Sequence, residues 1–332
     1  MRSRLLNHIQ TTLHPERYHG RYKRPPFFEG WYFKLITLDT RARFAVIPGI
    51  FLSADAAVEH AFIQVFDGIS GHVSYHRFPA AEFHATDAPF EVRIGRNSFR
   101  LDGITLDIAD DLRTVKGDLR FGAATPWRVK ALEPGVMGWL GWLPFLECYH
   151  GVLSFDHRLE GALTVDGARI DFTDGHGYIE KDWGKSFPGG WVWMQTNHFA
   201  GSVGTSFTGA TAITPLAGRW FPGFLAGLYH NGELHRFASY SYAKIDKLAV
   251  SDHSVEWVVS DRDKRMEINA RRAEYSILPG PDRHAMGMRV PETLKAEISV
   301  RLTHSGGTIF EGTGTCAGLE LAGDLDKLLR AL

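Results

Sequence analysis

The stretch FFEGWYFKLITL, residues 27–38, decides the fold because its pattern returns in the second half of the chain. The later stretch FPGGWVWMQTNH, residues 187–198, again places a phenylalanine before a Gly-Trp pair and an aromatic-rich, strand-like run. The tryptophans of the two pairs, Trp31 and Trp191, are separated by nearly half of the 332 residues. Self-similarity at this spacing predicts two β units, each opening with a Gly-Trp strand.

The sequence around these two stretches alternates between apolar and polar residues and is interrupted by turn signals. Examples are FEVRIGRNSFRLDGITLDI (90–108) and GALTVDGARIDF (161–172), where Asp-Gly pairs suit tight turns between antiparallel strands. A helical pattern is clear only near the end, where leucines from Leu319 to Leu332 predict a short amphipathic helix. We therefore expect an all-β protein of two lipocalin-like antiparallel β-barrel domains, residues 1–177 and 178–332, with a short C-terminal helix.

Composition excludes several classes of protein. The 37 basic and 38 acidic residues nearly cancel, which argues against nucleic acid as a partner. Two cysteines cannot build a disulfide framework or a four-cysteine zinc site. The first twenty residues contain no apolar run of signal-peptide length, so we expect a cytoplasmic protein.

One apolar segment, PGVMGWLGWLPFL at Pro134 to Leu146, is too short to span a membrane as a helix. Its tryptophans, methionine and helix-breaking residues suit a loop that touches lipid or closes an apolar pocket. An ordinary buried loop is the alternative. The segment therefore predicts, at most, peripheral contact with a membrane.

Three longer stretches resemble a known family. They are YHGRYKRPPFFEGWYFKL (18–35), PGVMGWLGWLPFLECYHGVLSFDHRLEG (134–161) and GHGYIEKDWGKSFPGGWVWMQTNHF (175–199). Their order and spacing resemble tocopherol cyclase and its bacterial relatives, a family distantly similar to carotenoid hydratases. The resemblance implies two lipocalin-like β domains, in agreement with the internal repeat.

The resemblance also implies a reaction. A prenylated hydroquinone closes a chromanol ring when its phenolic oxygen adds across the nearest double bond of its own tail. The reaction needs no redox cofactor, and its substrate is a hydrophobic prenylated small molecule. Two alternatives remain open: a non-catalytic carrier of such a molecule, and a hydratase that adds water to a terpenoid alkene.

Protonation of an alkene needs an acid that keeps its proton near neutral pH, and burial can supply one by raising a carboxyl pKa. Glu29, Glu180 and Asp182 are the candidate acids. Aromatic faces stabilise the cation that follows. The candidates for that role are Trp31, Tyr32, Trp183, Trp191 and Trp193.

A phenol that attacks must lose its proton, which suits a histidine, and His150 and His198 lie within the motifs. Asn197 could orient the phenol, and Lys181 could keep a neighbouring carboxylate charged. Structural roles compete with each of these assignments. Glu180 and Asp182 would share one face of a strand while Lys181 points to the other, as in an ion-pair corner, and Glu29 could pair with Arg21 or Arg24.

Histidines elsewhere invite a metal site that their spacing does not favour. His72 and His76 would share a strand face but lie roughly 13 Å apart at ~3.3 Å per residue, too far for one ion. The segment DFTDGHG, residues 171–177, is better explained as a turn. We therefore predict neither a metal nor a cofactor.

Overall fold

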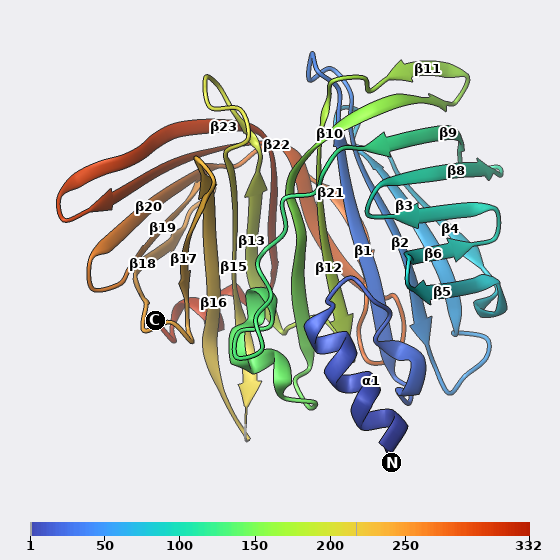
Figure 1. The fold of residues 1–332 in the computed structure, drawn as a ribbon, viewed down its shortest axis with the longest axis horizontal. Helices are drawn as coiled ribbons and strands as arrows, with labels where there is room; N and C mark the ends of the chain where they lie inside the picture. Colours follow the sequence, from blue (N-terminus) through green and yellow to red (C-terminus); the bar gives the residue numbers. More distant parts are fainter. Residues whose placement is uncertain (1, 217) are drawn as a thin grey trace. The chain divides into compact units, whose positions relative to one another are not determined.

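The computed structural model describes residues 2–216 and 218–332 and consists mostly of antiparallel strands (Figure 1). The strands form two sheets, and a short helix, α2 (Leu325–Leu329), lies near the end of the chain. This arrangement confirms the predicted all-β fold of two antiparallel sheets. In the part of the chain described, the strand order of each sheet runs from one edge to the other without a closing pair.

The first sheet has the order β4-β3-β2-β1-β12-β10-β9-β8-β7-β6-β5, and β11 pairs with β10. Its central strands β1 and β12 come from opposite ends of the first half of the chain, and both are almost completely buried. The bounds are β1 Phe27–Ile36, β2 Arg43–Leu52, β3 His60–Asp67, β4 Val73–Phe78, β5 Phe83–Asp87, β6 Phe90–Ile94, β7 Asn97–Arg100, β8 Gly103–Ala109, β9 Thr114–Phe121, β10 Cys148–Val165, β11 Ala168–Asp171 and β12 His176–Gly184.

The second sheet has the order β17-β16-β15-β13-β23-β22-β20-β19-β18, with β14 paired to β23 and β21 to β22. The repeated Gly-Trp stretch forms β13, which lies at the centre of this sheet as β1 does in the first. The bounds are β13 Gly190–Thr196, β14 His198–Phe199, β15 Ser206–Leu216, β16 Arg219–His230, β17 Glu233–Ala238, β18 Lys244–Val250, β19 Ser254–Ser260, β20 Lys264–Arg271, β21 Ser276–Gly280, β22 Met288–His304 and β23 Gly307–Gly323.

The chain divides into two compact units that do not follow the sequence order strictly. The first unit is Met1–Phe187 with Pro279–Met288, and the second is Pro188–Leu278 with Arg289–Leu332. The first unit extends beyond the expected boundary at Gly177 because β12 pairs with β1 and β10.

The segment 279–288 is attached to the first unit by specific contacts. The Gln64 side chain donates to the Pro279 carbonyl at 3.0 Å, and the Phe187 amide donates to the Pro281 carbonyl at 3.0 Å. Arg283 forms an ion pair with Glu147 at 2.7 Å. The first unit therefore includes a short piece of chain made late in synthesis.

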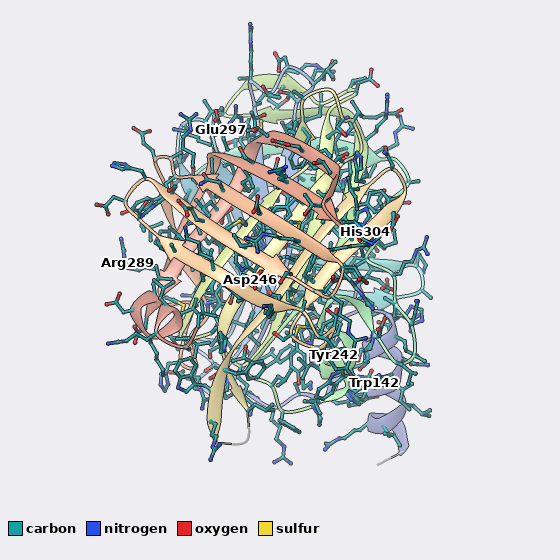
Figure 2. All side chains as sticks on the ribbon, turned by 90° about the vertical axis from the view of Figure 1, so that its left-hand side faces the viewer. Trp142, Tyr242, Asp246, Arg289, Glu297 and His304 are labelled. Carbon is teal, nitrogen blue, oxygen red and sulfur yellow. The ribbon has the colours of Figure 1, made fainter. Side chains whose placement is uncertain are left out.

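Each sheet has its own hydrophobic core. On β1, alternate residues Trp31, Phe33 and Leu35 enter the core of the first unit, as the period of a strand requires. In the second unit, Trp257 of β19 is fully buried in a separate core. Figure 2 looks onto β18, β19, β20 and β22, where polar side chains such as Asp246 cover the other face.

The helices correct two sequence-based expectations. A helix that the sequence did not predict, α1 (Arg2–Leu13), opens the chain. At the other end, Leu319 and Leu321 belong to β23, so the helix begins only after Asp324, whose carboxylate accepts a hydrogen bond from the Lys327 amide at 2.9 Å. Within the described ranges, none of the helices has the length and apolar character needed to cross a membrane.

Among its described residues, the first unit contains three short 3₁₀ helices. They are η1 (Gly20–Tyr22), η3 (Gly135–Trp142) and η2 (Ala80–Glu82). The apolar segment that the sequence predicted as a loop thus contains η3, which packs against β10 and α1. The contact with α1 includes His8, whose Nε2 lies 3.1 Å from the Trp142 carbonyl oxygen. In Figure 1, α1 (blue) lies at the lower end of the first sheet.

Candidate active site

Charged residues on β12 point to opposite faces of the first sheet. In the antiparallel register, Trp31 of β1 lies opposite Lys181, and His150 of β10 lies opposite Asp182. Residues directly opposite each other share a face, and successive residues alternate. Lys181 is therefore on one face, and Glu180 and Asp182 are on the other, as the sequence predicted.

The first group of charges, which we call the Lys181 cluster, comprises Lys181, Glu29 and His19. Lys181 Nζ lies 2.5 Å from Glu29 Oε1, and both side chains are fully buried. The carboxylate also accepts hydrogen bonds from the His19 backbone amide at 3.0 and 2.9 Å. The ion-pair partner of Glu29 is thus Lys181 rather than Arg21 or Arg24, and Arg21 instead pairs with Asp87 at 3.4 Å.

This pairing determines the charge of Glu29. Burial alone would raise the pKa of Glu29, but Lys181 and His19 outweigh burial and hold that pKa below its ordinary value. Burial also lowers the pKa of Lys181, against the opposing effect of Glu29. Glu29 is therefore an ionised carboxylate near neutral pH, which does not suit the role of proton donor expected from the sequence.

Aromatic rings surround the Lys181 cluster. The Lys181 ammonium lies 4.7 Å from the centre of a Trp31 ring and 4.9 Å from that of a Trp183 ring. Trp183 stacks on His19 at 4.1 Å and on Tyr149 at 5.4 Å. Trp31 and Trp183, which the sequence suggested as stabilisers of a substrate cation, thus already contact the Lys181 ammonium. Trp31 also belongs to the hydrophobic core.

The second group, the His150 cluster, comprises His150, Glu180 and Asp182 on the other face. His150 Nδ1 lies 2.9 Å from Asp182 Oδ1, and Nε2 lies 3.5 Å from Glu180 Oε2. The Tyr178 hydroxyl donates to the same Glu180 oxygen at 2.6 Å. Two acidic residues and one histidine proposed from the sequence are therefore brought together.

The two carboxylates of the His150 cluster favour the protonated form of His150, which the sequence had suggested as a base. Burial lowers the pKa of His150, but the Asp182 and Glu180 carboxylates together outweigh burial and raise it to about 9. His150 is then an imidazolium near neutral pH, held by two carboxylates. It suits the role of proton donor rather than that of the base predicted from the sequence.

The His150 cluster is also the place where a cation could bind. Its three possible ligand atoms lie within 4.8 Å of one another, and one imidazole with two carboxylates is a donor set used by several divalent metals. Two of the other histidines considered from the sequence also lie close to a carboxylate: His76 lies 2.6 Å from Asp110, and His176 lies 3.0 Å from Asp156. Neither forms part of a three-ligand group in the described ranges.

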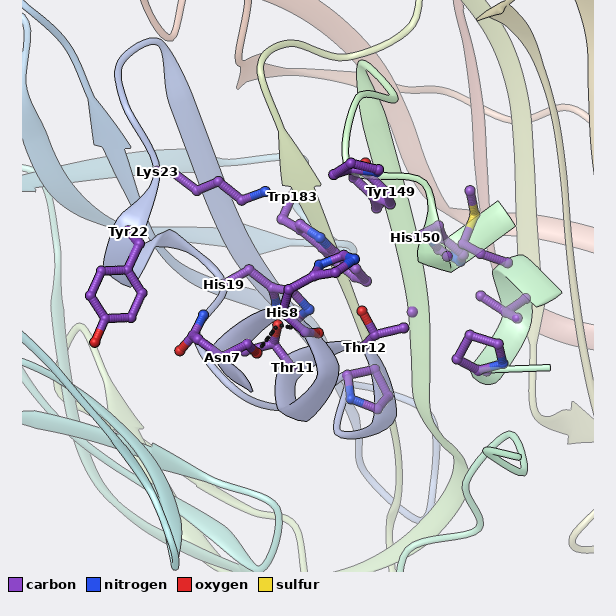
Figure 3. Close-up of a pocket in the computed structure, with 18 of the residues that line it drawn as sticks. Asn7, His8, Thr11, Thr12, His19, Tyr22, Lys23, Tyr149, His150 and Trp183 are labelled. Atoms are coloured by element: carbon purple, nitrogen blue, oxygen red, sulfur yellow. Dashed lines mark hydrogen bonds between the residues drawn. The ribbon is translucent and has the colours of Figure 1, made fainter. Parts of the chain in front are cut away.

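A cavity of about 160 Å³ lies in the first unit, between α1, η3 and the strands β10 and β12 (Figure 3). His19, Trp183, Tyr149 and His150 line it, so it reaches members of both clusters. An apolar cavity of about 150 Å³ holds one benzene ring. The remaining lining residues are Arg4, Asn7, His8, Thr11, Thr12, Pro15, Tyr22, Lys23, Pro134, Gly135, Val136, Met137, Gly141, Pro144, Gly151 and Val152.

The other residues proposed from the sequence lie elsewhere. Tyr32 is buried on β1 opposite Glu180 and does not line the cavity. Trp191, Trp193, Asn197 and His198 belong to the second unit, where the Trp191 indole donates to Glu320 at 2.6 Å and His198 Nδ1 lies 3.0 Å from Asn197 Oδ1. The cavity is lined by the first unit alone, so these four residues are not part of it.

Sequence reasoning missed His19, Tyr149 and the whole of α1. His19 lies inside the first stretch that resembles the cyclases. It is a single histidine in a segment without strand or helix periodicity, so the sequence contains no signal that predicts a role for it. Its position became apparent only from the fold, which brings it against Glu29 and Lys181.

Comparison with known proteins identifies the family. A sequence model of the family described as tocopherol cyclase-like matches residues 115–323. The protein named "Probable tocopherol cyclase, chloroplastic" from Oryza sativa subsp. japonica is 26% identical over 212 residues, which make up 59% of this chain and 44% of that protein. The chloroplastic tocopherol cyclase of Zea mays is 30% identical over 116 residues, or 34% and 24% of the two chains. The chain thus spans less than half the length of these relatives.

Solved structures share the fold. The crystal structure of CghA with Sch210972 matches with a TM-score of 0.58 and 15% identity over 90% of this chain and 89% of that one. Kievitone hydratase from Nectria haematococca matches with a TM-score of 0.50 and 13% identity over 92% and 94%. Because the family match extends over more than half of the sequence, the protein belongs to the tocopherol cyclase-like family.

Proposed function

We propose that this protein closes a chromanol ring in a prenylated hydroquinone by acid catalysis. One alkene carbon takes a proton, the phenolic oxygen bonds to the more substituted carbon, and the phenol loses its own proton. The product is an isomer of the substrate, and no electrons are exchanged with a cofactor.

The observation that carries this proposal is an aromatic cavity that is lined by residues of both clusters, among them the protonated His150. An imidazolium that is held by Asp182 and Glu180 can deliver a proton to an alkene carbon as the phenolic oxygen attacks, so that no free cation must persist. The cavity volume suits a single aromatic head group, and the prenyl tail would extend out of it. Membership of the tocopherol cyclase-like family supports the same substrate class.

The reaction can be tested by incubating the protein with geranyl hydroquinone in detergent made up in D₂O. We expect a chromanol that carries one carbon-bound deuterium and is otherwise an isomer of the substrate. A product that has gained the elements of water would indicate a hydratase. Binding without any product would indicate a carrier, and either result would overturn ring closure as the function.

We also propose that the substrate reaches the cavity from a membrane surface. Apolar side chains are exposed on the two elements that flank the cavity: Leu5 and Leu6 of α1 are 61% and 53% exposed, and Trp139 and Phe145, in and beyond η3, are 51% and 59% exposed. Tryptophan and phenylalanine at such positions insert into the interfacial region of a bilayer.

Sedimentation with phosphatidylcholine vesicles tests this contact. Replacing Trp139 and Phe145 with serine is expected to lower the vesicle partition coefficient at least about tenfold, because two aromatic anchors are lost. The control is Tyr275→Ser, which removes a 57% exposed aromatic ring from the second unit. Equal binding of the double variant and the unmodified protein would exclude a membrane contact at this surface.

A further inference from the structure

His19 has one ring nitrogen that the described part of the chain leaves without a hydrogen-bond partner. The residue is only 7% exposed, and it lines the cavity beside Trp183. Its Nε2 is buried and has no hydrogen-bond partner among the residues that the structure describes. Since nearly all buried polar atoms are paired, this nitrogen points to a missing partner.

Counting protons on the other side of the ring assigns the tautomer. The Lys181 ammonium has three protons and three oxygen acceptors: the Pro15 carbonyl at 2.8 Å, the Arg17 carbonyl at 2.5 Å and Glu29 Oε1 at 2.5 Å. His19 Nδ1 lies 3.1 Å from the same Glu29 oxygen and 2.9 Å from Lys181 Nζ, whose three protons are already matched by the three oxygen acceptors. All partners are satisfied when Nδ1 carries the proton and donates it to Glu29, which leaves a lone pair on Nε2.

We propose that His19 Nε2 binds the hydroxyl of an aromatic ligand in the cavity and accepts its proton during ring closure. The inference rests on the proposed function for its chemistry. During the step, His150 gives a proton to the alkene carbon, the phenolic oxygen forms the new carbon–oxygen bond, and its proton moves to Nε2. His19 then loses this proton to solvent and His150 regains one, so atoms and charge balance.

The surroundings of His19 suit this role. Burial, with Lys181 adding to it, lowers the pKa of His19 to about 4, so the ring is neutral and able to accept a proton near neutral pH. The stacked Trp183 and the hydrogen bond to Glu29 fix the plane of the imidazole. A carboxylate that orients a histidine in this way is a recurring arrangement for a general base.

The binding part is tested with geranyl hydroquinone and its dimethyl ether, which cannot donate a hydrogen bond. We expect the unmodified protein to bind the hydroquinone about tenfold more tightly than the ether, and His19→Phe to abolish this preference while keeping a flat ring on Trp183. The control is His14→Phe, which changes a half-exposed histidine of the same segment and should retain the preference. A preference that survives in His19→Phe would overturn the proposal.

Two further measurements keep the test independent of folding and of turnover. If His19→Phe does not fold, ¹⁵N NMR of the unmodified protein decides: the unprotonated Nε2 signal should shift on adding the hydroquinone and stay in place on adding the ether. If ring closure occurs, His19→Gln should lower kcat about 100-fold. A hydroxyl preference without product would reject the proposed function but retain the binding site, whereas product formation without the preference would reject only this inference.

Discussion

Replacing Lys181 with methionine is expected to lower the free energy of unfolding by about 3–5 kcal/mol, because it leaves the Glu29 carboxylate buried without its counter-charge. Neither side chain of this pair has any exposed surface. The substitution also removes the cation that lies between Trp31 and Trp183 and leaves the Pro15 and Arg17 carbonyls without their donor. Urea unfolding followed by circular dichroism would measure the loss.

Two controls separate the buried charge from the loss of a lysine in general. The double variant Glu29→Gln/Lys181→Met should recover a large part of the loss, because no charge then remains unpaired. Lys247→Met breaks an ion pair with Glu256 in which both side chains are about half exposed, and it should cost no more than about 1 kcal/mol. If Lys181→Met lowered the free energy of unfolding by no more than Lys247→Met does, Glu29 would have to be neutral in the folded protein.

The second large effect concerns turnover. His150→Gln is expected to lower kcat by about 10²–10⁴-fold, because glutamine can hydrogen-bond to Asp182 but cannot transfer a proton to the alkene. The hydroquinone should still bind, since the rings that line the cavity are unchanged. The measurement is single-turnover formation of the chromanol, with thermal unfolding to verify the fold.

The pH dependence identifies the proton that matters. Activity requires the protonated form of His150, so it should fall as the pH rises through about 9. In Asp182→Asn one of the two carboxylates that raise this pKa is lost, and the fall should move toward pH 7. His176→Gln, which breaks a different histidine–aspartate pair, should leave the alkaline limb in place. An alkaline limb unaffected by Asp182→Asn would remove His150 from the role of acid.

The internal repeat and the alternation of side chains predicted much of this arrangement. The Gly-Trp stretches became β1 and β13, each central in one of the two sheets. Alternation along YIEKDWG correctly separated Lys181 from Glu180 and Asp182. These features follow from the period of a strand, which is a local property that a sequence displays directly.

Proton affinity could not be predicted in the same way. Glu29 and Glu180 are both glutamates in aromatic strands, yet one faces a lysine and the other a histidine and a tyrosine. His150 and His19 differ just as strongly, with pKa values shifted in opposite directions by their neighbours. These differences depend on distances across the fold, and the sequence records such distances only indirectly.

The segment 279–288 has a consequence for the order of events at the ribosome. When residues 1–187 have emerged, the strands of the first sheet are all present, but the partners of Gln64, Phe187 and Glu147 have not yet been synthesised. These contacts can form only after residues 188–278 and then the segment 279–288 have also emerged. A gene divided after codon 187 would therefore encode a first fragment that lacks part of its own structure, so the two units cannot be exchanged between proteins as simple consecutive modules.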